Sequence, residues 1–198
     1  MIRMRARVAG VVGAALTLSV LPATAADALS GGRHAGHDVV TRADAEVHRD
    51  HRTVTDLDFD VRRRGSRLDS ATNLAVAYAR CTDCRSLSVA FQVVLVRRPA
   101  ADLSVVNRAV GVTDRCVRCE ALAYAYQWVV VTRGWLTPAG HWKLAGIKQE
   151  LRALVRSRAS AGELQAAVAS LAAQVGEVLA SEIRNAPHSQ VLHSADRR

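Results

Sequence analysis

The sequence predicts an α+β protein in which a small antiparallel sheet of about five strands is followed by a C-terminal helical hairpin. Three observations lead to this fold class. Residues 53–61 alternate apolar and polar side chains, as a half-buried strand does. An internal repeat, at residues 73–92 and again at 107–127, then places a C-x-x-C pair in each copy. Beyond residue 137, apolar residues recur at three- and four-residue steps, which is typical of amphipathic helices.

The composition is that of a globular protein of modest size. Hydrophobic residues make up 49% of the 198-residue chain, a share too high for general disorder. The chain carries 27 Lys and Arg against 18 Asp and Glu, for a net charge of +9, and every basic residue except Lys143 and Lys148 is arginine. Because such arginine enrichment is also typical of GC-rich genomes, it does not by itself predict nucleic-acid binding.

Residues 1–25 have the three parts of a secretory signal peptide. Three arginines precede an uncharged, mostly apolar stretch at residues 8–21, and small residues follow at 23–25. The apolar stretch is short for a bilayer span, which needs about 20 residues, and no later stretch is long and apolar enough. We therefore expect cleavage before Ala26, a mature chain without a transmembrane span, and a secreted or cell-envelope-associated protein.

Removal of the signal leaves a net charge of +6, because it takes away three arginines and no acid. A cation of that size suits an anionic wall polymer as partner. An envelope protein whose identity the sequence does not give is the other expected partner. Nucleic acid is not expected, since little of it is met outside the cell.

Residues 26–52 contain no aromatic side chain and predict a polar, basic, disordered arm. His34 and His37 have a spacing that suits metal ligation on a helix, but in a glycine-rich arm solvated side chains are the expected state. In the first strand, Asp56, Asp58 and Asp60 share one face. We expect that face to be solvated rather than to bind a cation.

The repeat defines a predicted domain at residues 53–136. Its matching positions are Asn73, Cys81, Cys84 and Gln92 in the first copy and Asn107, Cys116, Cys119 and Gln127 in the second. The cysteines and the glutamine recur at one constant offset, and the offset of the asparagine is one residue shorter, so one residue is inserted before the second cysteine pair. Each copy is predicted to be an antiparallel hairpin with the C-x-x-C pair in its connection. The asparagines and glutamines are predicted to be structural, with the glutamines bonding to each other between the copies.

Bulky and small residues alternate after each cysteine pair, so one face of the sheet needs a cover and the other permits close approach of a second backbone. A helical hairpin at residues 137–185 supplies the cover. Thr137 and Pro138 are typical of a helix start, and Ser160 with Glu163 forms a capping box for a second helix. The alternative is that these helices form a homodimer interface. Residues 186–198 are expected to form a polar tail.

The four cysteines allow three kinds of chemistry. In an exported chain, structural disulfides are the expected state, and the sequence leaves their connectivity open. Zinc bound by all four thiolates is an alternative, although the two pairs stand further apart in the chain than is usual for such a site. Thiol–disulfide exchange is another, since arginines flank both pairs. No cofactor other than such a zinc ion is expected.

The block from Asp56 to Val131 resembles a family of small exported or envelope proteins of high-GC Gram-positive bacteria, most of them uncharacterised. Its mark is a duplicated N-x-A-x-A…C-x-x-C…A-x-Q unit, matched here by the eight repeat positions named above, followed by a helical segment. Some members are labelled peptide zinc metalloproteases through association with membrane proteins of that kind. This chain lacks the H-E-x-x-H motif such a protease requires, so the resemblance implies an accessory partner of a membrane metalloprotease rather than the protease.

The function expected from the sequence is an exported, disulfide-stapled structural or interaction module of the cell envelope. The sequence contains no H-E-x-x-H, G-x-S-x-G, P-loop or G-x-G-x-x-G motif, which favours a non-enzymatic protein. A redox or zinc-binding protein that uses the two C-x-x-C pairs is the alternative.

Overall fold

Five strands form one sheet in the order β1-β2-β3-β4-β7. They are β1 (Gly36–Ala45), β2 (Thr53–Ala79), β3 (Arg85–Thr113), β4 (Glu120–Val131) and β7 (Gln190–Arg197). The first four are parallel neighbours, and only β7 runs antiparallel, against β4. The computed structural model describes residues 36–45, 51–184 and 190–197, which all belong to His34–Arg198, the second of two compact units in the chain. The predicted signal peptide at residues 1–25 lies outside the described residues.

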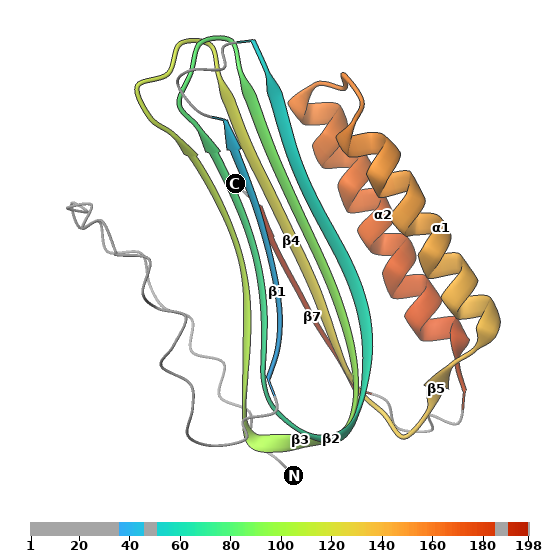
Figure 1. Cartoon of the computed structure of the whole chain (residues 1–198). Helices are drawn as coiled ribbons and strands as arrows, with labels where there is room; N and C mark the ends of the chain where they lie inside the picture. Colours follow the sequence, from blue (N-terminus) through green and yellow to red (C-terminus); the bar gives the residue numbers. More distant parts are fainter. Residues whose placement is uncertain (1–35, 46–50, 185–189, 198) are drawn as a thin grey trace. The chain divides into compact units, whose positions relative to one another are not determined.

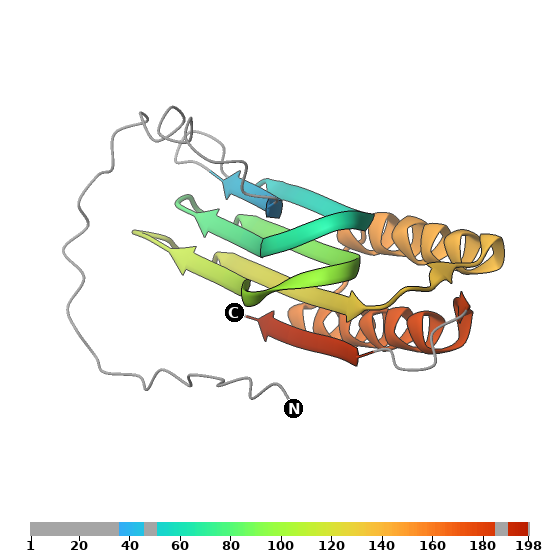
Figure 2. The same ribbon diagram turned by 90° about the horizontal axis from the view of Figure 1, so that it is seen from below.

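The sheet is folded on itself into two layers, because β2 and β3 are long and bend in the middle (Figures 1 and 2). The first layer contains residues 53–64 of β2, residues 85–96 of β3, β4 and β7, and we call it the helix-facing layer. The second contains β1, residues 70–79 of β2 and residues 104–113 of β3, and we call it the open layer. The chain thus winds as parallel coils, each passing once through both layers.

The parallel pairing shows that the predicted antiparallel hairpins are wrong. The segments before and after each C-x-x-C turn lie in different layers and pair with their counterparts in the other copy. Asn73 stands opposite Asn107, and Gln92 opposite Gln127. Hairpins and coils require the same alternation of small and bulky residues, so periodicity does not separate them. Stacking like on like places identical side chains in register, as in solenoid proteins.

The α+β class and the C-terminal helical hairpin are confirmed. The hairpin consists of α1 (Pro138–Val155) and α2 (Ala161–Glu182), and two short strands, β5 (Trp135–Leu136) and β6 (Ile183–Arg184), pair at its base. Thr137 caps α1 by accepting a hydrogen bond from the Gly140 amide, and Ser160 and Glu163 form the capping box of α2. Within the described part of the chain, α2 is the one helix long and apolar enough to cross a membrane, but its apolar face packs into the core.

The two faces of the helix-facing layer differ as predicted. Its bulky outer face packs under α1 and α2, and its aromatic rings lie 5.0–6.2 Å apart, from Phe59 through Phe91 to Trp128. Its inner face meets the open layer through small side chains, which include Ala75, Ala90 and others of the same size. Alanine between the layers lets the two backbones approach closely.

Two predicted boundaries are wrong. Residues 36–45 of the expected disordered arm form β1, whose every second side chain is buried between the layers. Residues 190–197 of the expected polar tail form β7. Both segments are too polar to be recognised as strands on their own, and both are ordered by pairing with a strand far away in the sequence.

Candidate functional site

The eight residues that define the repeat fall into two groups. The four cysteines lie in the turns that connect the open layer to the helix-facing layer, at the end of the stack that we call the turn end. The four amides, Asn73, Gln92, Asn107 and Gln127, lie between the layers. The repeat therefore brings together two clusters with different chemistry.

Gln92 and Gln127 form a hydrogen-bonded ladder inside the stack. The Nε2 group of Gln127 donates to Oε1 of Gln92 at 2.5 Å, which is the bond between the copies that the sequence predicts. The same amide donates across the interior to the Ala71 carbonyl, and Nε2 of Gln92 donates to the carbonyls of His37 and Thr72. Both side chains are almost completely buried. The ladder thus ties successive coils together and also ties one layer to the other.

Asn73 and Asn107 form a second ladder. They lie in the open layer and donate to carbonyls of the helix-facing layer, whereas the glutamines donate from the helix-facing layer to the open layer. Asn73 Nδ2 donates to Oδ1 of Asn107 at 2.8 Å and to the carbonyls of Ala90 and Tyr126 in the helix-facing layer. Asn107 in turn donates to the carbonyl of Ser194 in β7. Since a buried amide without a partner is costly, these contacts explain why both copies carry asparagine at this position.

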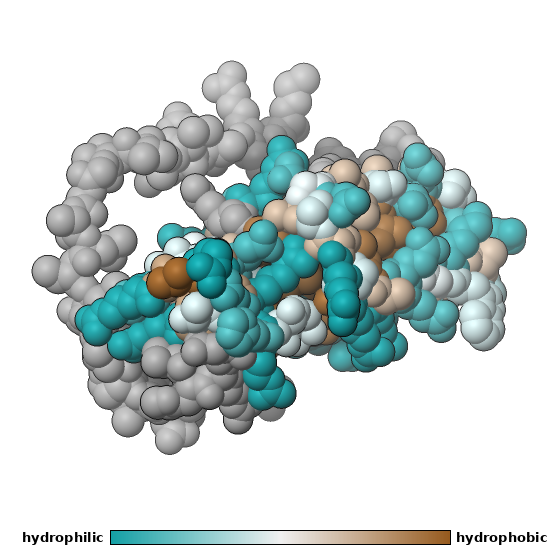
Figure 3. All heavy atoms as spheres, turned by 90° about the horizontal axis from the view of Figure 1, so that it is seen from above, coloured by the Kyte–Doolittle hydropathy of each residue, from teal (hydrophilic) through white to brown (hydrophobic). Residues whose placement is uncertain are grey.

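The cysteines are paired within each C-x-x-C motif, Cys81 with Cys84 and Cys116 with Cys119. The two turns stack directly, with Thr82 opposite Val117, so the second disulfide lies against the first. The sulfur atoms of Cys84, Cys116 and Cys119 all lie within 4.8 Å of one another. Figure 3, which looks down on this end, shows hydrophilic side chains with apolar patches between them on the described surface.

The residue inserted in the second copy is accommodated next to Cys116. The register is Ala79 with Thr113 before the insertion and Thr82 with Val117 after it. Between these pairs Arg115 adopts a left-handed backbone with φ of 46°. The insertion therefore forms a local bulge and leaves the stacking of the cysteine pairs intact.

Left-handed residues also occupy the same place in three successive turns. His51, Asp83 and Arg118 have φ of 59°, 53° and 54°. The His51 amide donates to the Thr82 carbonyl, and the Asp83 amide donates to the Val117 carbonyl. Stacking brings the Asp83 carboxylate to 2.7 Å from a terminal nitrogen of Arg118 and to 3.4 Å from Nδ1 of His51.

The arginines that flank the cysteines are all within 4 Å of a carboxylate. Arg85 lies 3.0 Å from Glu120, and Arg118 binds Asp83 with two nitrogens. Arg80 and Arg115 both approach Asp114, at 3.6 and 3.9 Å. A thiolate is favoured by cations that face it without a competing anion. These ion pairs therefore weaken the argument that the arginines activate the cysteines.

The pKa values of two groups at the turn end are shifted. The hydrogen bond from Arg118 holds the pKa of Asp83 below its usual range, and the charges of Arg118 and His51 act in the same direction. The pKa of Tyr78 is raised, first by desolvation and then by its hydrogen bond to Asp114. Near neutral pH both shifts favour a charged Asp83 and a neutral Tyr78, so the network keeps one charge state.

The acidic row Asp56, Asp58 and Asp60 does not form a solvated outer face. It lies in the edge strand of the helix-facing layer and points inward, in register with the row that contains Ser88 and Gln92. Asp56 accepts from the Arg42 amide of β1, and Asp60 lies 2.6 Å from Nε2 of His37. The opposite face of the strand packs into the core under the helices, which forces the acids inward. His37 is buried as a result, contrary to the expected solvated arm, while His34 lies outside the described residues.

Two features of the site were not recognised in the sequence. Asp83 and Arg118 are the third residues of their motifs, and their opposite charges at the same offset as the cysteines are the signal that indicates stacked turns. Asp196 accepts from the Ala109 amide, so β7 covers part of the exposed edge of the open layer.

No known protein family, curated protein or solved structure matches this chain. The function proposed below therefore rests on the chain's own residues.

Proposed function

We propose that this protein is an exported, non-enzymatic structural or interaction module of the cell envelope. The observation that supports this proposal is that all eight residues conserved between the two copies of the repeat are bonded within the framework. The four amides bond to one another and to backbone carbonyls, and the four cysteines are paired within their turns. Side chains that hold the framework together in this way are not available to bind a substrate.

The outer surface of the open layer supports an interaction role. The helices cover the other layer, whereas Val40, Val106 and Val112 on the open layer are 41–60% exposed. They lie on β1 and on the second half of β3, which pair with β2 from either side. The same face carries the exposed Asp38 and Arg42, and apolar side chains bordered by charged ones are typical of a surface that meets a partner.

Export is tested by fractionating a culture that expresses all 198 residues of the sequence. We expect the protein in the medium or the wall fraction, with an N-terminus at Ala26. A variant with Leu16→Arg, which places a charge in the apolar stretch, should stay inside the cell. Equal secretion of both forms, or an unprocessed chain in the cytoplasm, would contradict the exported role.

The framework role of the cysteines is tested on the protein purified without reductant. Its denatured mass should be lower than that of the reduced chain by four hydrogens, and no cysteine should alkylate before reduction. It should also fail to accelerate the reduction of insulin by dithiothreitol. Insulin reduction that Cys116→Ser abolishes would overturn the non-enzymatic proposal.

One observation favours a second candidate, a thiol redox or metal-binding function. Three sulfur atoms from two turns lie within 4.8 Å, and tetrahedral zinc needs sulfurs about 3.8 Å apart, given a Zn–S distance of about 2.3 Å. The disulfides must first be reduced, because the thiolate is the ligand. Cobalt titration of the reduced protein tests this candidate. Thiolate-to-cobalt absorption at one equivalent, lost in Cys84→Ser, would support it.

A further inference from the structure

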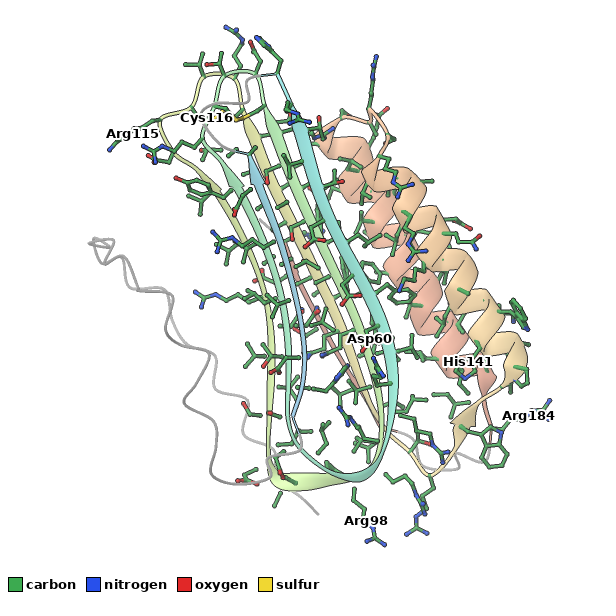
Figure 4. The ribbon with its side chains drawn as sticks, in the orientation of Figure 1. Asp60, Arg98, Arg115, Cys116, His141 and Arg184 are labelled. Atoms are coloured by element: carbon green, nitrogen blue, oxygen red, sulfur yellow. A yellow bond between two sulfur atoms is a disulfide. The ribbon has the colours of Figure 1, made fainter. Side chains whose placement is uncertain are left out.

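The two ends of the coil stack carry different surfaces. Figure 4 shows Arg115 and Cys116 at the turn end, and Arg98, His141 and Arg184 at the opposite end, where β2 and β3 bend. We call the second the corner end. It also holds the start of α1 and the end of α2, so it combines residues from both layers and from the helical hairpin.

Arginines at the corner end lack the ion pairs of the arginines that flank the cysteines. Every flanking arginine of the turn end has a carboxylate within 4 Å. In the described part of the chain, no carboxylate lies within 4 Å of the exposed arginines of the corner end. These are Arg63, Arg97, Arg98, Arg133 and Arg184.

The acidic groups near these arginines do not balance them. Glu182 is engaged by Lys143 at 2.6 Å and by the Thr137 hydroxyl. Asp69 and Asp102 lie in the two bends and have interactions of their own. Five arginines and one lysine thus stand against three carboxylates, two of which lie in the bends. The corner end therefore carries a net positive charge.

Contacts in the backbone make this surface continuous. The Thr132 amide donates to the Val96 carbonyl, which places Arg97 beside Arg133. Trp135 then pairs with Arg184 between β5 and β6. These contacts connect the bend of β3 to the base of the helical hairpin.

Two tryptophans are exposed on the same end. Trp142 is 78% exposed and Trp135 is 45% exposed, whereas Trp128 is buried in the core. Lys148 of α1 donates to the Phe59 carbonyl. Trp142 lies six residues nearer the corner end, a rise of about 9 Å, or about three residues of the neighbouring strand. This places Trp142 at about the level of Arg63 along the stack.

We propose that the corner end binds the surface of a bilayer that contains anionic phospholipids. Unpaired arginines attract an anionic surface, and the indole of tryptophan prefers the boundary between headgroups and acyl chains. The tryptophans favour a bilayer over a wall polymer, because a hydrophilic polymer offers no apolar phase to an indole. The inference rests on the proposed envelope role and names the surface that the module meets.

Vesicle binding tests this proposal. Protein recovered from the culture medium, or the full chain if it stays in the cells, is sedimented with vesicles of phosphatidylcholine alone or of phosphatidylcholine and phosphatidylglycerol in equal parts. All variants share one N-terminus, so differences between them report the corner end. We expect binding to the anionic vesicles only, weakened by added salt, with a blue shift of tryptophan fluorescence. A failure to bind leaves the secretion result unchanged, so the two proposals fail separately.

Matched variants locate the surface. Neutralising two corner arginines, as Arg97→Gln with Arg98→Gln, should lower the partition coefficient about 25-fold, at about fivefold for each arginine. The control changes two exposed arginines elsewhere, Arg108→Gln with Arg115→Gln, and should stay within about twofold of wild type. Trp142→Ala should lower binding several-fold, whereas Val117→Ala at the turn end should not change it.

Several outcomes would overturn the proposal. Loss of binding to the same extent in the control pair would show that only net charge matters. Equal binding to phosphatidylcholine vesicles would show that the arginines are not involved. If soluble poly(glycerol phosphate) bound as tightly as vesicles and Trp142→Ala had no effect, the surface would be a polymer site instead.

Discussion

The carboxylate of Asp83 and the guanidinium of Arg118 form a two-pronged ion pair between corresponding positions of the two C-x-x-C turns. Both residues have a left-handed backbone, and the turns that carry them are stacked. The pair thus connects successive coils at the surface of the turn end, as the amide ladders connect them between the layers.

This ion pair predicts a loss of stability in acid. Since Arg118 lowers the pKa of Asp83 in the folded protein, the folded state binds fewer protons than the unfolded state as pH falls below about 4. The contribution is therefore full above that pH and is lost on the way to the lower folded pKa. Thermal unfolding between pH 2.5 and 6 should show this component in wild type but not in Asp83→Asn. The exposed Asp38→Asn is the control, and the same acid loss in Asp83→Asn would contradict the prediction.

The glutamine ladder should make a measurable contribution to stability. Gln127→Ala removes donors to Gln92 and to the Ala71 carbonyl and leaves a small cavity. We expect a loss of about 2–4 kcal/mol in the free energy of unfolding, measured with urea. Gln165→Ala on the exposed face of α2 should change it by less than about 0.5 kcal/mol. A loss below about 1 kcal/mol for Gln127→Ala would show that the ladder is replaceable.

The two disulfides should contribute unequally. Each closes a loop of only about four residues, for which chain entropy gives about 2 kcal/mol. Cys81 and Cys84 are also buried, whereas Cys116 and Cys119 are partly exposed. Urea unfolding should therefore show a larger loss for the double serine variant of the first pair than for that of the second. Equal losses would mean that burial of the first pair adds nothing.

The spacing of the layers should be sensitive to side-chain size. Ala90 is fully buried between them, and its carbonyl accepts from Asn73. Ala90→Leu should cost at least about 1–3 kcal/mol, because the larger side chain forces the layers apart and stretches the cross-layer bonds. Ala180→Leu on the exposed face of α2 should be neutral. Wild-type stability of Ala90→Leu would contradict close packing of the layers.

Local features were predictable from the sequence, and remote pairings were not. The helix caps at Thr137 and Ser160 depend on neighbouring residues, so their motifs are sufficient. The small inner face also follows from alternation. The parallel direction of the strands depends on which remote segment each strand meets, and alternation carries no information about that. The burial of His37 was not predictable either, because it depends on contact with Asp60 in a remote segment of the chain.

The helical hairpin limits how many coils the stack can hold. Four strands of the helix-facing layer, at about 4.8 Å each, span about 19 Å. Two helices side by side, with axes about 10 Å apart, cover nearly the same width. A further coil would leave its bulky outer side chains without a cover unless a third helix were added. The width that the two helices cover, rather than the repeat itself, therefore sets the number of coils in this solenoid.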